Sequence, residues 1–294
     1  MLTIFSIPKP FIGHIATIQR NAIRSWTLLQ PHPEIILFGD DEGTAEVARD
    51  LGILHFPEVM RNEYGTPLLH DFFQKAEDHS SHSVLCYVNA DIILTDDFFR
   101  AVHLVSESRS KFLIVGKRWD MDICDPLNFG MPNWDGELRD IVLKVNRQRP
   151  SNWIDYFVFS KGLGSSLQPF AIGRTSWDNW LIWHARTSGA TVVDVSDSVI
   201  AIHQNHDYAH HPGGKVGVWD GEEATRNYAL AGGWRHLYTI ENATHKLTQR
   251  GLQRNWHHQV ILMKREIERD WGLMRAFPRA PAWIRSRLRG RQGG

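Results

Sequence analysis

The most constraining feature of this 294-residue sequence is a regular alternation between short apolar runs and stretches with helical spacing. Such strand–helix alternation with short links predicts βαβ units, and therefore an open, mainly parallel sheet with helices on both faces. The expected fold class is α/β. The apolar runs cover residues 2–7, 34–38, 53–56, 84–88 and 112–115, and the helical patterns between them cover residues 15–26, 44–51 and 67–76.

The pattern loosens after Gly116, where Trp, Asp, Asn and Pro crowd together, and returns at a strand over 156–159. A helix over 177–187 and strands near residues 192 and 200 follow. We expect one domain over residues 1–215, divided into a first part (1–116) and a second part (117–215). Residues 216–294 are expected to form a helical extension. Its basic tail suits an anionic membrane surface as well as a solvated terminus.

Charge and motif content exclude several function classes. The 33 Lys and Arg residues balance 33 Asp and Glu residues, which argues against a nucleic-acid partner. Two cysteines cannot form a disulfide framework, so a reducing cytoplasm is the expected location, with possible contact of the tail with the inner membrane face. A dinucleotide fingerprint, a Walker loop and a Gly-x-Ser-x-Gly elbow are all missing, which argues against redox enzymes, P-loop ATPases and serine hydrolases.

The strongest positive signal is Asn89-Ala90-Asp91, which directly follows the apolar run at 84–88. Open α/β sheets bind their ligands at the carboxyl ends of their strands. In an extended chain, side chains two residues apart point the same way, so Asn89 and Asp91 would present two oxygen ligands together. Such a pair suits Mg²⁺ or Mn²⁺, although an Asp/Asn turn after a strand is also common in any α/β protein.

This arrangement resembles the nucleotide-sugar-binding half of GT-A-type glycosyltransferases, which carry an Asp-x-Asp or similar motif after a central strand. The resemblance covers roughly residues 1–205 and implies a GT-A-like fold with a Rossmann-like nucleotide-binding half and an acceptor half. It also implies that a divalent cation, Mn²⁺ or Mg²⁺, grips the diphosphate of the sugar donor. Asn89 departs from the family pattern, so the metal would rest mainly on Asp91.

The same resemblance implies further site residues. The acidic turn after the second strand would contact the nucleoside, the end of the first strand would face the same pocket, and the loop at 61–67 would lie over the donor. A histidine soon after the last core strand would be the second metal ligand, and an imidazole must be neutral to bind metal, so activity should fall in mild acid. The donor-site residues are Ser6, Pro8, Asp40, Asp41, Asn62, Asn89 and Asp91, and the metal ligands are Asp91 and His203.

The acceptor side is expected around residues 151–159 and 170–180. In inverting members of the family, a carboxylate at a helix start deprotonates the acceptor hydroxyl, and Asp178 fits that place; a carboxylate there is also an ordinary helix cap. Asp155 is the rival base or an acceptor ligand. Trp177 and Trp180 would frame the sugar beside Asn179. The acceptor would be a carbohydrate or a lipid-linked sugar.

Three other functions stay open. A sugar nucleotidyltransferase also uses an open α/β sheet and a metal. A metal-dependent hydrolase could use the histidine cluster from His203 to His211, although His206, His210 and His211 fit a mobile loop better. A carbohydrate-binding protein without catalysis would keep donor binding and lack turnover.

Overall fold

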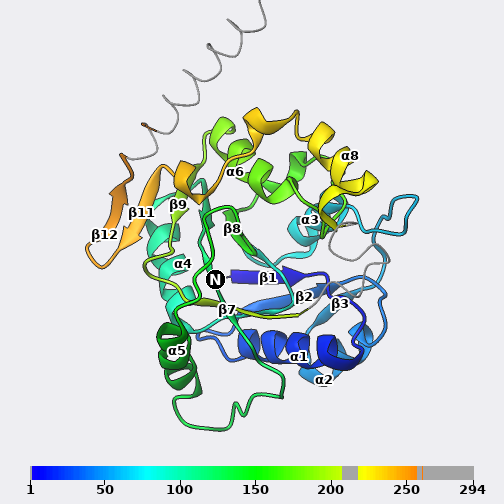
Figure 1. The fold of residues 1–294 in the computed structure, drawn as a ribbon, viewed down its shortest axis with the longest axis vertical. Helices are drawn as coiled ribbons and strands as arrows, with labels where there is room; N and C mark the ends of the chain where they lie inside the picture. Colours follow the sequence, from blue (N-terminus) through cyan, green and yellow to red (C-terminus); the bar gives the residue numbers. More distant parts are fainter. Residues whose placement is uncertain (1, 207–217, 257–259, 261–294) are drawn as a thin grey trace, which may run out of the picture. The chain divides into compact units, whose positions relative to one another are not determined.

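The computed structural model describes residues 2–206, 218–256 and 260, and its described part is built around a nine-stranded sheet (Figure 1). The strand order is β12-β11-β9-β6-β8-β4-β1-β2-β3. The strands are β1 (Leu2–Ser6), β2 (Glu34–Phe38), β3 (Leu54–Phe56), β4 (Val84–Val88), β6 (Phe112–Val115), β8 (Tyr156–Ser160), β9 (Thr191–Asp194), β11 (His245–Thr248) and β12 (Gly251–Arg254).

The sheet is mainly parallel, as the sequence predicts. Strands β3, β2, β1 and β4 are parallel neighbours, and so are β6, β9 and β11. The alternation pattern does not reveal that β8 runs antiparallel between β4 and β6. This strand brings the residue before Tyr156 to the end of β4, which matters for the site.

Helices cover both faces of the sheet because the buried strands are apolar on both sides. In β1, Leu2 and Ile4 face the layer of α1 (Gly13–Thr27), α2 (Thr44–Leu51) and α4 (Asp96–Ser108). Phe5 faces the opposite layer, which contains α3 (Leu69–His79) and α6 (Trp177–Thr187). Figure 1 shows α1 and α2 on one side of the sheet and α3 and α6 on the other. In the described part of the chain, no helix is both long and apolar enough to cross a bilayer.

A second, three-stranded sheet lies beside the large one. It consists of β5 (Ile92–Ile93), β10 (Ala201–Gln204) and β7 (Arg118–Met121), with β10 in the middle. Strand β10 pairs antiparallel with β5 and parallel with β7. Helix α5 (Trp134–Val145) packs against it through Leu138 and Val142.

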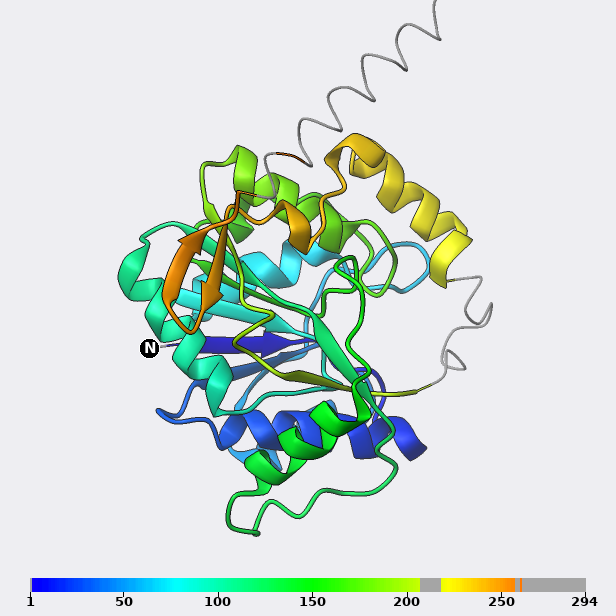
Figure 2. The ribbon, with the colours of Figure 1, turned by 60° about the vertical axis from the view of Figure 1, so that its left-hand side comes forward.

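The chain after residue 217 contains both helix and strand. Helix α8 (Glu222–Leu230) is followed by two short 3₁₀ helices and by β11 and β12, which form the antiparallel hairpin drawn in orange in Figure 2. Strand β11 extends the large sheet beside β9, and the chain up to Asn255 forms one compact unit. The basic tail expected from residue 271 onward lies outside the described residues, and the domain boundary at 215 stays a prediction.

Gly116 shows how tightly the centre is packed, and it provides a test of the fold. An ideal Cβ at this position would lie 1.9 Å from the hydroxyl oxygen of Tyr156, which is fully buried. We expect Gly116→Ala to lower the free energy of unfolding by about 1–3 kcal/mol, because the ring has no room to retreat. Urea denaturation measures the change.

Tyr156→Phe provides the control, because it removes the clashing oxygen, which is itself buried without a hydrogen-bond partner. The alanine substitution should therefore destabilise the Tyr156→Phe variant less than the wild type. Equal losses in the two backgrounds would contradict this account of the packing.

Candidate functional site

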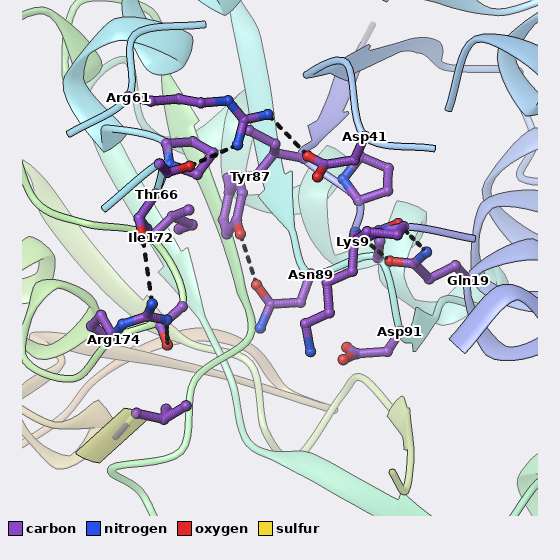
Figure 3. Close-up of a pocket in the computed structure, with 18 residues that line it drawn as sticks. Lys9, Gln19, Asp41, Arg61, Thr66, Tyr87, Asn89, Asp91, Ile172 and Arg174 are labelled. Atoms are coloured by element: carbon purple, nitrogen blue, oxygen red, sulfur yellow. Dashed lines mark hydrogen bonds and ion pairs between the residues drawn. The ribbon is translucent and has the colours of Figure 1, made fainter. Parts of the chain in front are cut away.

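A pocket with a volume of about 290 Å³ opens beyond the carboxyl ends of β1, β2 and β4, where the sequence predicts a ligand site. Figure 3 shows its labelled side chains, with Asn89 and Asp91 on one side and Arg61 and Asp41 on another. The chain after β1 also contributes to the wall through residues 7–10. The side chains of Asn89 and Asp91, which follow β4, thus line the same cavity.

The small sheet brings distant residues of the chain to this pocket. Asp91 directly precedes β5, and His203 of β10 stands in register with Ile92 of β5 and with Asp120 of β7. The backbone N–H of Gln204 also donates to the carbonyl oxygen of Asp91 at 3.2 Å. Strand pairing therefore fixes the predicted metal ligands Asp91 and His203 beside each other.

Asp91, His203 and His206 form a cluster whose ligand atoms all lie within 4.8 Å of one another. The Oδ2 atom of Asp91 lies 3.1 Å from Nε2 of His206 and 3.9 Å from Nε2 of His203. The other carboxylate oxygen, Oδ1, is buried without a hydrogen-bond partner. One carboxylate and two imidazoles that converge, with a second carboxylate oxygen still unpartnered, fit a divalent transition-metal ion.

The electrostatics of Asp91 suit the same role. Burial alone would raise the pKa of Asp91, but the imidazoles of His203 and His206 and the ammonium of Lys9 outweigh it and hold the pKa below its usual range. Figure 3 shows the Lys9 side chain extending toward Asp91. The carboxylate is therefore ionised at neutral pH, as a metal ligand must be.

Asp120 orients His203 from the side opposite to Asp91. Its Oδ1 lies 3.5 Å from Nδ1 of His203, and its carboxylate also accepts hydrogen bonds from Arg118 and Arg149. Burial would raise the pKa of Asp120, but these partners lower it to about 2. A carboxylate behind a ligating histidine fixes the orientation of the ring, a role that the sequence analysis did not assign.

Asn89 is held in a different set of contacts. Its Oδ1 accepts a hydrogen bond from the hydroxyl of Tyr87 at 2.8 Å, and its Nδ2 donates to Oδ1 of Asp155 at 2.7 Å. The antiparallel β8 creates this pair, because Val88 stands in register with Tyr156. A carboxylate at position 89 would face that of Asp155, so an amide suits this place.

The predicted nucleoside-binding residues divide between the pocket and its surroundings. Pro8 and Asp41 line the pocket, whereas Asp40 does not line it and its side chain is 70% exposed. Both aspartates form ion pairs with Arg61, at 2.6 Å for Asp40 and 3.1 Å for Asp41. Arg61 is itself a pocket residue that the sequence analysis placed only within the loop over the donor.

Ser6 and Asn62 lie outside that lining. Ser6 is fully buried and its hydroxyl donates to the carbonyl oxygen of Val88 at 2.6 Å. Asn62 accepts from the backbone N–H groups of Tyr64 and Thr66 and donates to Glu223 of α8. Both residues therefore shape the walls: Ser6 ties β1 to β4, and Asn62 holds the loop at 61–67.

The predicted base Asp178 lines a second cavity of about 160 Å³, together with Asp155. Asp178 lies in the first turn of α6, and its Oδ1 is buried without a hydrogen-bond partner. Burial raises the pKa of Asp178 to about 7, helped by the nearby charge of Asp155. Asp155 instead uses both oxygens, since Oδ1 accepts from Asn89 and Oδ2 accepts from Arg118 at 2.8 Å.

The other predicted acceptor residues are mostly in the core. Trp177 and Trp180 are 5% and 4% exposed and pack with Phe157 and Phe170. Asn179 donates its side-chain N–H to the carbonyl oxygen of Tyr238. The aromatic walls of the second cavity come from two other tryptophans, Trp153 and Trp219.

His206 is the member of the cluster that the sequence does not predict. The sequence pattern groups it with His210 and His211 in a mobile loop, but the structure places it beside Asp91, and the other two lie outside the described residues. The available signal was its spacing: His206 follows His203 by three residues at the end of a strand.

Comparison with known proteins gives structural neighbours but no sequence relatives. No protein-family model and no curated protein sequence matches this chain. Glucosyl-3-phosphoglycerate synthase from Mycobacterium tuberculosis, solved with Mn²⁺, UDP and phosphoglyceric acid, is 15% identical, with a TM-score of 0.49 and coverage of 80% of this chain and 79% of that one.

Two further neighbours are similar at the same level. A fragment of S. aureus TarS is 8% identical, with a TM-score of 0.48 over 69% of this chain, which spans 60% of that fragment. A Desulfovibrio desulfuricans protein described as a nucleotide-diphospho-sugar transferase is 10% identical, with a TM-score of 0.41 over 78% of this chain and 96% of that one.

Proposed function

We propose that this protein is a metal-dependent glycosyltransferase that moves a sugar from a nucleoside-diphosphate sugar to an acceptor hydroxyl. The observation that carries the proposal is the position of Asp91, which belongs both to the pocket at the strand ends and to the Asp–His–His cluster. A ligand in this pocket can therefore contact a cation held by Asp91, His203 and His206. The fold provides this contact through the pairing of β5 with β10.

The charges of the donor pocket suit a diphosphate. Lys9 and Arg61 line it, and a divalent cation held by Asp91, His203 and His206 would add two further positive charges. Guanidinium and ammonium groups bind phosphate oxygens by charge-assisted hydrogen bonds. When bound, Mn²⁺ or Mg²⁺ would act as a Lewis acid that stabilises the nucleoside diphosphate as it leaves.

Asp178 is the proposed general base on the acceptor side. A base works best when its pKa lies near the working pH, and Asp178 combines a raised pKa with an oxygen that has no other partner. Asp155 is the weaker candidate, because Asn89 and Arg118 occupy both of its oxygens. Direct attack by a hydroxyl activated by Asp178 would invert the configuration at the sugar carbon.

The segment after β1 argues against a sugar nucleotidyltransferase. That class would favour a glycine-rich loop here, whose backbone N–H groups surround the phosphates. This chain instead has Pro8 and Pro10, which lack the N–H donor. A hydrolase would want a second carboxylate converging with the histidines, and the nearby Asp120 already accepts hydrogen bonds from two arginines.

A nucleotide-sugar panel tests the proposal. We expect one nucleoside-diphosphate sugar to stabilise the protein only with metal, and a rise in melting temperature reports this stabilisation. At ~100 times its dissociation constant, the ligand should add about 2.7 kcal/mol to the free energy of unfolding. Because imidazole nitrogens suit a transition-metal ion better than the hard Mg²⁺ ion, Mn²⁺ should be more effective than Mg²⁺. The same donor should be hydrolysed slowly in the absence of an acceptor.

Chelator-treated protein and free nucleosides are the controls. Metal-dependent binding without any turnover, with or without acceptors, would favour a carbohydrate-binding protein. No stabilisation by any nucleotide sugar with either metal would overturn the donor-site assignment.

A further inference from the structure

The cavity that contains Asp178 adjoins the donor pocket and has its own aromatic wall. The two cavities share Gly173, Arg174 and Val218 in their linings. Gly173 has a φ of +70° and an ideal Cβ there would meet nothing within 4 Å, so no side chain obstructs this boundary. A ligand in the second cavity is therefore next to a donor in the first.

Trp153 and Trp219 provide the aromatic wall, with ring centroids 5.5 Å apart and planes inclined by 50°. The guanidinium carbons of Arg118 and Arg149 lie 4.8 and 4.9 Å from the centroid of Trp153. Both arginines are themselves fixed by Asp120. The position of the Trp153 indole is thus set before any ligand arrives, which limits the entropy lost on binding.

Opposite charges within the protein already balance the cations of this cavity. Arg118 pairs with Asp155 and Asp120, and Arg174 makes an ion pair with Glu223 at 2.6 Å. Among the described lining residues these are the cations, while Asp155 and Asp178 provide negative charge. An anionic ligand would have to compete with these carboxylates, whereas a neutral polyhydroxylated ring would not.

We propose that this cavity is an acceptor subsite for a neutral pyranose, which packs its C–H face against the Trp153–Trp219 wall and turns a hydroxyl toward Asp178. The inference rests on the proposed function for the role of that hydroxyl. Aromatic rings suit the apolar face of a sugar, and the carboxylate of Asp178 accepts from its hydroxyls. The acceptor class is therefore a neutral glycan end rather than a phosphorylated or carboxylated sugar.

Saturation-transfer NMR on the full chain tests the subsite with defined probes. The neutral probes are the methyl β-pyranosides of glucose, galactose, mannose and N-acetylglucosamine. The anionic probes are glucose 6-phosphate and glucuronic acid. We expect transfer to the ring protons of at least one neutral glycoside, and about tenfold weaker binding in Trp219→Ala. Trp219→Phe, which keeps a ring, should retain most of the binding.

Trp234→Ala is the matched control, because Trp234 is 46% exposed and lies outside both linings. Stabilisation by metal and nucleotide sugar is measured on every variant and should not change in Trp219→Ala. The subsite is overturned if no neutral glycoside binds, if the anionic probes bind in their place, or if Trp219→Ala binds like the wild type. If the wild type binds a neutral glycoside but no nucleotide sugar, the result contradicts the proposed function and not the subsite.

Discussion

Replacing Asp91 with alanine is expected to weaken Mn²⁺ binding at least about 100-fold, because even residues behind metal ligands contribute 10–100-fold. Asp91 is the carboxylate of the three-residue cluster, and its Oδ2 lies within 4 Å of both imidazoles. The variant should also lose metal-dependent stabilisation by nucleotide sugars. Titration of the purified chain with Mn²⁺, followed by the electron paramagnetic resonance signal of the free ion, measures the affinity without reference to turnover.

Asp122→Ala is the matched control for this experiment. Asp122 lies just beyond β7, its side chain is 65% exposed, and its carboxylate pairs with Arg147 and accepts a hydrogen bond from the side chain of Asn205. Its removal takes away the same charge from the same small sheet and should leave Mn²⁺ affinity within about twofold, as expected for an exposed pair. Unchanged affinity in Asp91→Ala would show that the cluster is not the metal site.

Replacing Asp178 with asparagine is expected to lower kcat by about 10²- to 10⁴-fold, the usual contribution of a general base. The wild-type rate should fall about tenfold per pH unit below pH 7, because protonation of Asp178 removes the base. Donor affinity should not change, since Asp178 lies outside the donor lining. Measurement of kcat and of donor KM from pH 5.5 to 8.5 separates these effects, with exposed Asp197→Asn as the matched control.

Although Asp178→Asn should lower kcat, it should raise the stability of the fold at high pH. Because the folded-state pKa of Asp178 is raised, its neutral form stabilises the fold fully below about pH 4, and this contribution is lost as the pH rises through about 7. Asp178→Asn has no carboxyl group to ionise, so at pH 8 it should melt at or above the wild type. A variant that stays fully active would show that Asp178 is not the base.

The sequence predicts the local part of this architecture well. The apolar runs that end at Phe38 and Val88 are strands with those ends, whereas the helix predicted to begin at Pro67 begins at Leu69. Burial on both faces makes these strands continuous apolar runs, which is a strong local signal. The motif Asn89-Ala90-Asp91 lines the pocket because it directly follows the carboxyl end of one of these strands.

Strand pairing explains most of what the sequence does not reveal. The antiparallel direction of β8 joins Asn89 to Asp155, and the register of β10 with β7 places Asp120 behind His203. Pairing between distant segments leaves no trace in local periodicity. The tryptophans show a second limit: Trp180 and Trp219 have the same chemistry, and only packing decides that one fills the core and the other lines a cavity.

The small sheet also determines how an ion bound at the cluster would affect the stability of the chain. Asp91 and His206 are 115 residues apart in sequence, and strands β5 and β10 hold their two segments together. A cation shared by both residues would act as a reversible cross-link that closes this long loop, and closing such a loop restricts the unfolded chain far more than the folded one. A bound ion should therefore stabilise the fold, and a chain that ends before His206 would lack one of the three ligands.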